Sequence, residues 1–146
     1  MFKRIVVGTD GSETAQEAVR QAVDLAKSTG ASLDIVSAYG GDSAAGGTRL
    51  EQVERPADVP ETAREQVNFA LDSAAGVAKK EGVEVQAHAE EGDPADALLN
   101  VAERLHADVI VVGNKGMTGA RRFLLGSVPN KVSHHAPCSV FIIRTT

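Results

Sequence analysis

The stretch of this sequence with the clearest chemical potential is GNKGMTGARRFLLGSV, residues 113–128, which follows the uncharged run VIVV. Its glycines stand at positions 113, 116, 119 and 126, and its cations at 115, 121 and 122. Glycines where a strand gives way to a helix let the backbone approach a ligand closely, and clustered cations favour an anion. We therefore expect an anion site here, with Lys115, between two glycines, as the contacting cation.

The end of this stretch has the composition of a helix start that binds an anion. Gly113 and Gly116 would let the backbone pass close to a ligand. A helix beginning near Ser127 would direct its first amides at the anion, namely those of Gly126, Ser127 and Val128. The Ser127 hydroxyl adds a donor. On glycine spacing alone, tight turns explain these residues equally well.

The charge distribution favours a small anion over nucleic acid. The chain carries a net charge of −5 with a sequence pI near 5.3 and only 3% aromatic residues, which argues against a nucleic-acid partner. The segment from Val109 to Thr146 nevertheless has five cations and no carboxylate. An acid-free segment in an acidic chain is what a small anionic ligand would require.

Strand and helix patterns alternate along the chain. Apolar, β-branched runs predict strands at 2–8, 32–38, 83–89, 108–113 and 139–144. Helical patterns run from a Ser12 cap to Gly30, over about 61–81, from an Asp93 cap with Pro94 in the first turn, and over about 127–135. This alternation predicts an α/β fold with a parallel sheet and helices on both faces. Ligands of such sheets bind beyond the carboxyl ends of the strands, where the strand order reverses.

Length and composition predict one globular domain over residues 1–146. No apolar run is long enough to span a membrane, and MFKRIVVGTDGS is not a signal peptide. The single cysteine, Cys138, cannot form an internal disulfide. We expect a cytoplasmic protein without a membrane partner.

Other motifs give no catalytic or metal site. GDSAAGGT (41–48) has Gly47 where a phosphate-binding loop needs lysine, and we expect a flexible loop there. His134, His135 and Cys138 are close in sequence, but adjacent histidines point in different directions and are favourable at a helix end without a metal. No residue stands out as a general base, so we expect no catalytic residue and at most a weak ATPase.

The chain as a whole resembles the nucleotide-binding branch of the universal stress protein family. The family signature, two glycines two residues apart and a glycine with Ser or Thr nine residues on, is met at Gly113, Gly116, Gly126 and Ser127. VVGTDGS, GDPADAL and LLGSV also match. The resemblance implies an adenine-nucleotide alpha-hydrolase-like, Rossmann-like sheet of order 3-2-1-4-5 with ATP at the switch point between the first and fourth strands.

The resemblance also implies a division of the site. Gly8, Thr9 and Asp10 would line the adenosine end, and the Ala38 backbone would meet adenine. The run Val112, Gly113, Asn114, Lys115 and Gly116 would lie under the ribose and phosphates, with Gly126, Ser127 and Val128 on the phosphate oxygens. Position 129, where nucleotide-binding relatives often supply a hydroxyl, is Pro129.

Three alternatives stay open at this point. The physiological ligand could be ATP, with or without magnesium, or AMP or cyclic AMP. Asp10 could accept from ribose hydroxyls or the adenine amine, or simply cap the following turn. A slow phosphatase or nucleotidase with Asp10 as its acid is the third possibility.

The last predicted strand indicates an assembly. SVFIIR (139–144) has no charge before Arg144, and an apolar strand at a sheet edge is usually covered. With the family resemblance, it predicts a homodimer through this strand.

Overall fold

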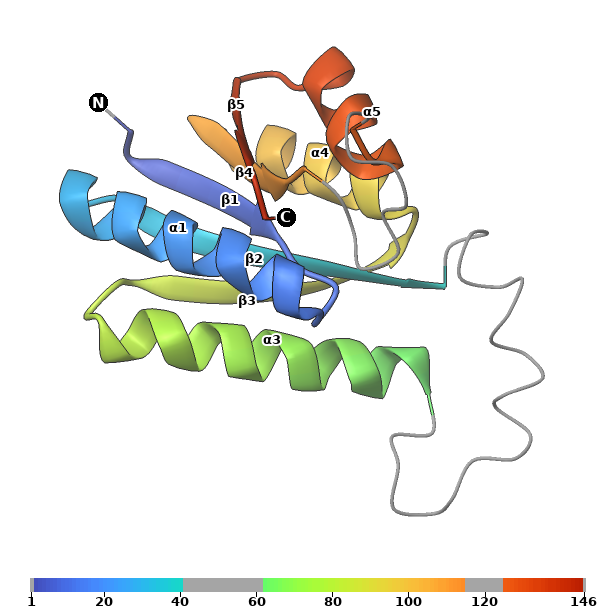
Figure 1. The fold of residues 1–146 in the computed structure, drawn as a ribbon, viewed down its shortest axis with the longest axis horizontal. Helices are drawn as coiled ribbons and strands as arrows, with labels where there is room; N and C mark the ends of the chain where they lie inside the picture. Colours follow the sequence, from blue (N-terminus) through green and yellow to red (C-terminus); the bar gives the residue numbers. More distant parts are fainter. Residues whose placement is uncertain (1, 41–61, 115–124, 146) are drawn as a thin grey trace.

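The computed structural model describes residues 2–40, 62–114 and 125–145. Its five strands form one parallel sheet of order β3-β2-β1-β4-β5, as predicted (Figure 1). The strands are β1 (Arg4–Gly8), β2 (Ser32–Gly40), β3 (Val85–Gly92), β4 (Val109–Gly113) and β5 (Ser139–Ile143). Within the described ranges, no helix is long and apolar enough to cross a membrane.

Helices cover both faces of the sheet (Figure 1). On one face, α1 (Glu13–Thr29) and α3 (Ala63–Lys80) bury their apolar sides against Ile5, Val7 and Ile35. On the other face, α4 (Pro94–Arg104) and α5 (Ser127–His135) pack on Val6, Val36 and other side chains of that face. Because neighbouring residues of a strand point to opposite faces, a sheet covered in this way needs apolar runs such as IVV without polar alternation.

The helix starts follow the predicted caps. Ser12 Oγ accepts a hydrogen bond from the Ala15 amide at 3.2 Å, and Asp93 Oδ2 accepts one from the Asp96 amide at 3.1 Å. α1 ends at Gly30, whose φ of 73° is the left-handed conformation that glycine adopts without strain.

Several strands begin or end at other residues than predicted. At two of these strand ends, backbone amides donate hydrogen bonds to groups outside the neighbouring strands. The amides of Lys3 and Arg4 donate to Asp108 Oδ2, at 2.8 and 2.9 Å, and the β1 ladder starts only at Arg4. These two bonds hold the pKa of Asp108 below its usual value. The Val83 amide donates to Ala78 O in the turn that ends α3, so β3 begins at Val85 and runs on to Gly92.

A buried carboxylate joins three neighbouring strands. The Asp34 side chain on β2 is only 1% exposed. Its Oδ2 accepts from Arg4 Nε of β1 at 2.9 Å, and its Oδ1 lies 2.8 Å from Nε2 of His88 on β3. Removal of the buried Asp34 carboxylate would leave Arg4 and His88 without their shared acceptor, and the contact between the three strands would be lost.

We expect Asp34→Ala to lower the free energy of unfolding by about 3 kcal/mol or more, because Arg4 and His88 lose their shared acceptor. Urea denaturation at pH 7 measures this loss. The matched control is Asp72→Ala, an exposed aspartate on α3, which should change stability by less than about 0.5 kcal/mol. Equal, small losses in the two variants would show that the buried cluster does not hold the strands.

Candidate functional site

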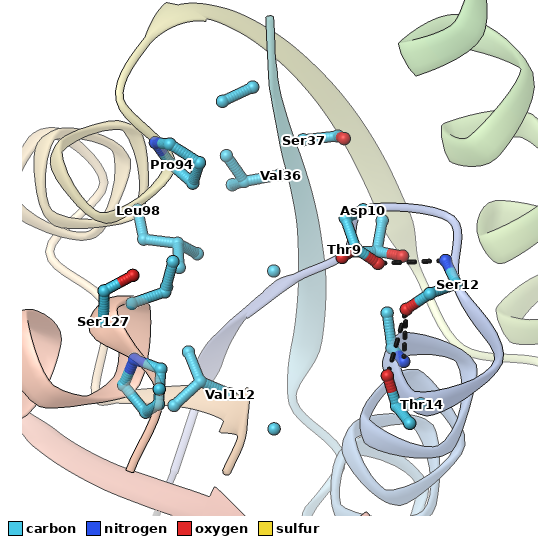
Figure 2. Close-up of a pocket in the computed structure, with 17 residues that line it drawn as sticks. Thr9, Asp10, Ser12, Thr14, Val36, Ser37, Pro94, Leu98, Val112 and Ser127 are labelled. Carbon is cyan, nitrogen blue, oxygen red and sulfur yellow. Dashed lines mark hydrogen bonds between the residues drawn. The ribbon is translucent and has the colours of Figure 1, made fainter. Parts of the chain in front are cut away.

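A pocket of about 290 Å³ opens at the carboxyl ends of β1 and β4, where the strand order reverses (Figure 2). This is where a parallel sheet of this order is expected to bind its ligand. Among the residues that line it are nine that the sequence had nominated: Gly8, Thr9, Asp10, Ala38, Val112, Gly113, Gly126, Ser127 and Val128. Segments far apart in the chain therefore meet at one cavity.

Of the other three nominated residues, Asn114 is described and is not part of this lining, and two lie outside the described residues. Asn114 is described, but its side-chain oxygen accepts hydrogen bonds from Thr145 and not from a pocket residue. Lys115 and Gly116 lie outside the described residues, as do Arg121 and Arg122. Their proposed contacts with a ligand stay predictions.

Pro129, at a position that the family resemblance places in the site, also lines the pocket. Seven further lining residues were not nominated from the sequence: Ser12, Thr14, Ala15, Val36, Ser37, Pro94 and Leu98. Three of them, Ser12, Thr14 and Ala15, belong to the start of α1, and Pro94 and Leu98 belong to α4. The signal that could have found them was the switch point itself, since helices that follow the strands begin at the edge where the ligand binds.

The loop between β1 and α1 holds a set of oxygens on one side of the pocket. Asp10 Oδ1 accepts from the Ser12 amide at 2.9 Å, and Thr9 Oγ1 accepts from the Gly11 amide at 3.1 Å. Ser12 Oγ also lies 3.1 Å from Thr14 Oγ1 (Figure 2). Asp10 thus caps the turn, which is one of the two roles that the sequence left open for it. Its exposed carboxylate also lines the pocket.

Apolar side chains separate this polar loop from the start of α5. Val36 of β2, Leu98 of α4 and Val112 of β4 lie between the two polar ends in the close-up (Figure 2). A Cβ on Gly8 would stand 2.9 Å from Leu98 Cδ1, so the glycine makes room for Leu98 against β1. A pocket with an apolar middle and two polar ends fits an elongated ligand with a planar, weakly polar part.

The start of α5 differs from the other helix starts at the pocket. α1 is capped by Ser12 and α4 by Asp93, whereas the cap of α5 is Gly126, with no side-chain hydrogen bond and no acidic residue in the first turn. The amides at the beginning of a helix need an acceptor from outside the helix and carry a partial positive charge. Ser127 and Val128, at the start of α5, line the pocket, and a helix start of this kind favours an anion. The amide of Gly126, which the sequence also nominated for the anion, donates instead to Asn114 O at 2.9 Å.

A lysine of α5, Lys131, forms ion pairs with two carboxylates at the start of the neighbouring helix α4. Lys131 Nζ lies 2.8 Å from Asp96 Oδ1 and 3.5 Å from Asp93 Oδ2 at the start of α4. The hydrogen bond that Lys131 donates to Asp96 raises the pKa of Lys131 above its usual value, so the lysine stays charged. These ion pairs reduce the repulsion that both carboxylates would exert on an anion.

The histidines and the cysteine near the C-terminus show no metal-site geometry. The rings of His134 and His135 are 6.4 Å apart and tilted by 56°. Burial raises the pKa of the Cys138 thiol, which disfavours the thiolate that a metal or an electrophile would need. Among the described residues, no group of three His, Cys, Asp or Glu side chains could hold a metal ion.

Comparison with known proteins places the chain in a family. A sequence model of the universal stress protein family matches residues 1–144. The universal stress protein MJ0531 of Methanocaldococcus jannaschii is 34% identical, over 99% of this chain and 83% of its own length. The universal stress protein Rv1636 of Mycobacterium tuberculosis is 37% identical, over 99% of this chain and 98% of its own.

Solved structures agree with the sequence comparison. A universal stress protein crystallised in complex with cAMP superimposes with a TM-score of 0.74 at 30% identity, covering 99% of this chain and 98% of that one. The extent of the family match and the level of identity leave no other assignment: the chain belongs to the universal stress protein family.

Proposed function

We propose that this chain is a cytoplasmic adenine-nucleotide-binding regulator of a stress response, with the nucleotide in the pocket at the β1/β4 switch point. The observation that carries the proposal is the uncapped, acid-free start of α5, which offers amides to an anion inside that pocket. A relative of 30% identity and the same fold binds cAMP, which has an adenine base and a phosphate. That relative supports the class of ligand proposed here.

The distribution of charge orients the nucleotide. Phosphates belong at the start of α5, at the amides of Ser127 and Val128, because a phosphate beside the Asp10 carboxylate would be repelled. Asp10 then accepts from ribose hydroxyls or the adenine amine, at the opposite polar end. The adenine lies along the apolar middle of the pocket, near the backbone of Ala38.

ATP is the first candidate, and cyclic AMP or AMP is the second. Pro129 lines the pocket without a hydroxyl, so one donor for a triphosphate is missing, and this favours the smaller ligands. Mg²⁺ separates the candidates, because it bridges the oxygens of a triphosphate and gives a cyclic monoanion little benefit. Calorimetry with ATP, AMP and cyclic AMP, each with and without Mg²⁺, identifies the ligand, and mass spectrometry of the nucleotide that co-purifies gives an independent identification.

Hydrolysis is expected to be slow. Fast phosphoryl transfer needs a base within hydrogen-bond reach of the attacking water at the γ-phosphate. The first turn of α5 has no carboxylate, Asp10 is at the other end, and Asp93 and Asp96 are occupied by Lys131. The proposed role is therefore binding and regulation.

The variant Gly126→Glu tests the anion site. Gly126 has φ −65° and ψ 169°, a conformation open to any residue, so the fold should persist. The added carboxylate should repel the phosphates and occupy the amides, lowering ATP affinity by a few kcal/mol, roughly a hundredfold or more. Calorimetry measures the change in ATP affinity. Gly116→Val, at a predicted ligand contact outside the described residues, should also weaken ATP binding.

The matched control is Ser133→Glu, which adds the same charge to the exposed part of the same helix, away from the pocket. It should keep ATP affinity within about threefold of wild type, because solvent screens a distant charge. Wild-type affinity in Gly126→Glu would show that the nucleotide does not use the start of α5.

We further propose a homodimer through β5. Both β3 and β5 lie at edges of the sheet, but β3 carries Glu90 and Glu91, whose charges protect an edge against pairing. On β5, Phe141 and Ile142 are each 37% exposed. An apolar edge of this kind favours pairing with a second copy about a two-fold axis.

Light scattering tests the dimer. Wild-type protein should be dimeric at micromolar concentration, and Ile142→Lys should shift it toward monomer because two lysines would face each other across the interface. Gln86→Lys, the same change in charge on the exposed β3 edge, should leave the dimer intact. Monomeric wild-type protein would contradict the proposal.

A further inference from the structure

Asn114 follows β4 directly and is hydrogen-bonded both to the segment that ends β5 and to the start of α5. Its amide donates to Ile143 O at the end of β5, at 2.8 Å. Its carbonyl accepts from the amide of Gly126, the cap residue of α5, at 2.9 Å. Its side-chain Oδ1 accepts from both the amide and the hydroxyl of Thr145, at 2.9 and 3.0 Å.

These bonds give Asn114 a task other than contact with a ligand. Oδ1 is already shared by two donors, and Asn114 is not among the residues that line the pocket. Its backbone, by contrast, is bonded directly to Gly126, whose neighbours Ser127 and Val128 supply the proposed phosphate amides. The orientation of the Asn114 peptide therefore sets the place of the α5 start.

The side chain fixes that orientation from the opposite side. The hydrogen bond from the Asn114 amide to Ile143 O and the two hydrogen bonds with Thr145 hold Asn114 on the segment that ends β5. An alanine at this position would keep the backbone bonds but lose the bonds to Thr145. The Asn114 carbonyl would then be free to tilt, and Gly126 would follow it.

We propose that Asn114 is a positioning residue that, held by Thr145, sets the start of α5 at the distance and angle that phosphate binding requires. The inference rests on the proposed function and names a residue that acts on one end of the nucleotide only. The loop at the adenosine end is held separately. There the Thr9 amide donates a hydrogen bond to Val36 O, and the Asp10 carboxylate accepts one from the Ser12 amide. Loss of the Asn114 side chain should therefore weaken the contribution of the phosphates and spare that of adenosine.

The experiment compares the dissociation constants of adenosine and ATP by calorimetry. Their ratio measures what the phosphates add to binding. In Asn114→Ala the ratio should fall by roughly tenfold, because two hydrogen bonds are lost, while adenosine affinity stays at the wild-type value. Thr145→Val loses one of the bonds and should lower the ratio by about threefold, whereas Thr145→Ser, which keeps the hydroxyl, should restore it.

A second measurement needs no nucleotide. Amide hydrogen exchange of Gly126 in the ligand-free protein should be faster by about tenfold or more in Asn114→Ala, because its acceptor becomes mobile. The matched control is Asn100→Ala, at an exposed asparagine of α4, which should leave both the exchange rate and the affinity ratio unchanged.

The outcomes separate the inference from the proposed function. Wild-type exchange at Gly126 in Asn114→Ala would overturn the inference alone. A reduced ratio in Asn114→Ala with a wild-type ratio in Thr145→Val would assign Asn114 to direct ligand contact and would also overturn it. A wild-type protein that binds neither ATP nor adenosine would overturn the proposed function and the positioning role with it.

Discussion

The amides at the beginning of a helix have no acceptor within the helix, and this constraint shapes the functional edge of the molecule. Each described helix follows a strand of a parallel sheet and therefore begins at the carboxyl edge of that sheet. Ser12, Thr62 and Asp93 satisfy the starts of α1, α3 and α4 with side-chain oxygens. Only α5, among these helices, begins without such an oxygen, at Gly126. The site thus arises where the chain omits a cap that it supplies elsewhere.

The rest of the fold keeps that uncapped start in place. The central strands are locked to one another by apolar packing on both faces and by Asp34, which joins Arg4 of β1 to His88 of β3. β4 and β5 extend this rigid part to the other side of the pocket, and Asn114 connects their ends to Gly126. A helix start can recognise a small anion only if its position is fixed to a fraction of an ångström, since hydrogen bonds weaken steeply with distance and angle.

The sequence predicted the architecture well because each of its signals is local. Apolar β-branched runs, the Ser12 and Asp93 caps and Gly30 depend on neighbouring residues, and the alternation of strands and helices leaves few topologies. The order 3-2-1-4-5 came from the family resemblance, and the structure confirms it. Strand bounds were less predictable: no local pattern shows that Asp108 binds the amides of Lys3 and Arg4.

The glycine spacing and the family resemblance nominated nine residues that line the pocket. Long-range hydrogen-bond partners could not be predicted. Asn114 and Thr145 are 31 positions apart in the sequence, and the partners of Asp34 are 30 and 54 positions away from it. Such pairings follow from strand register, which becomes known only once the sheet is built.

The same long-range view explains how an acidic chain can hold an anion. The acids nearest the proposed phosphate end, Asp93 and Asp96, are paired with Lys131, and the first turn of α5 has none. Asp10, the acidic side chain among the described lining residues, lies on the loop at the other end, where hydroxyl and amine donors of a nucleoside would meet it. The pocket is therefore electrostatically polarised, with helix amides at one end and a carboxylate at the other. A ligand with an anionic and a donor-bearing end enters such a pocket favourably in one orientation only, so the charge pattern would fix the direction of the proposed nucleotide before any specific contact with the base is made.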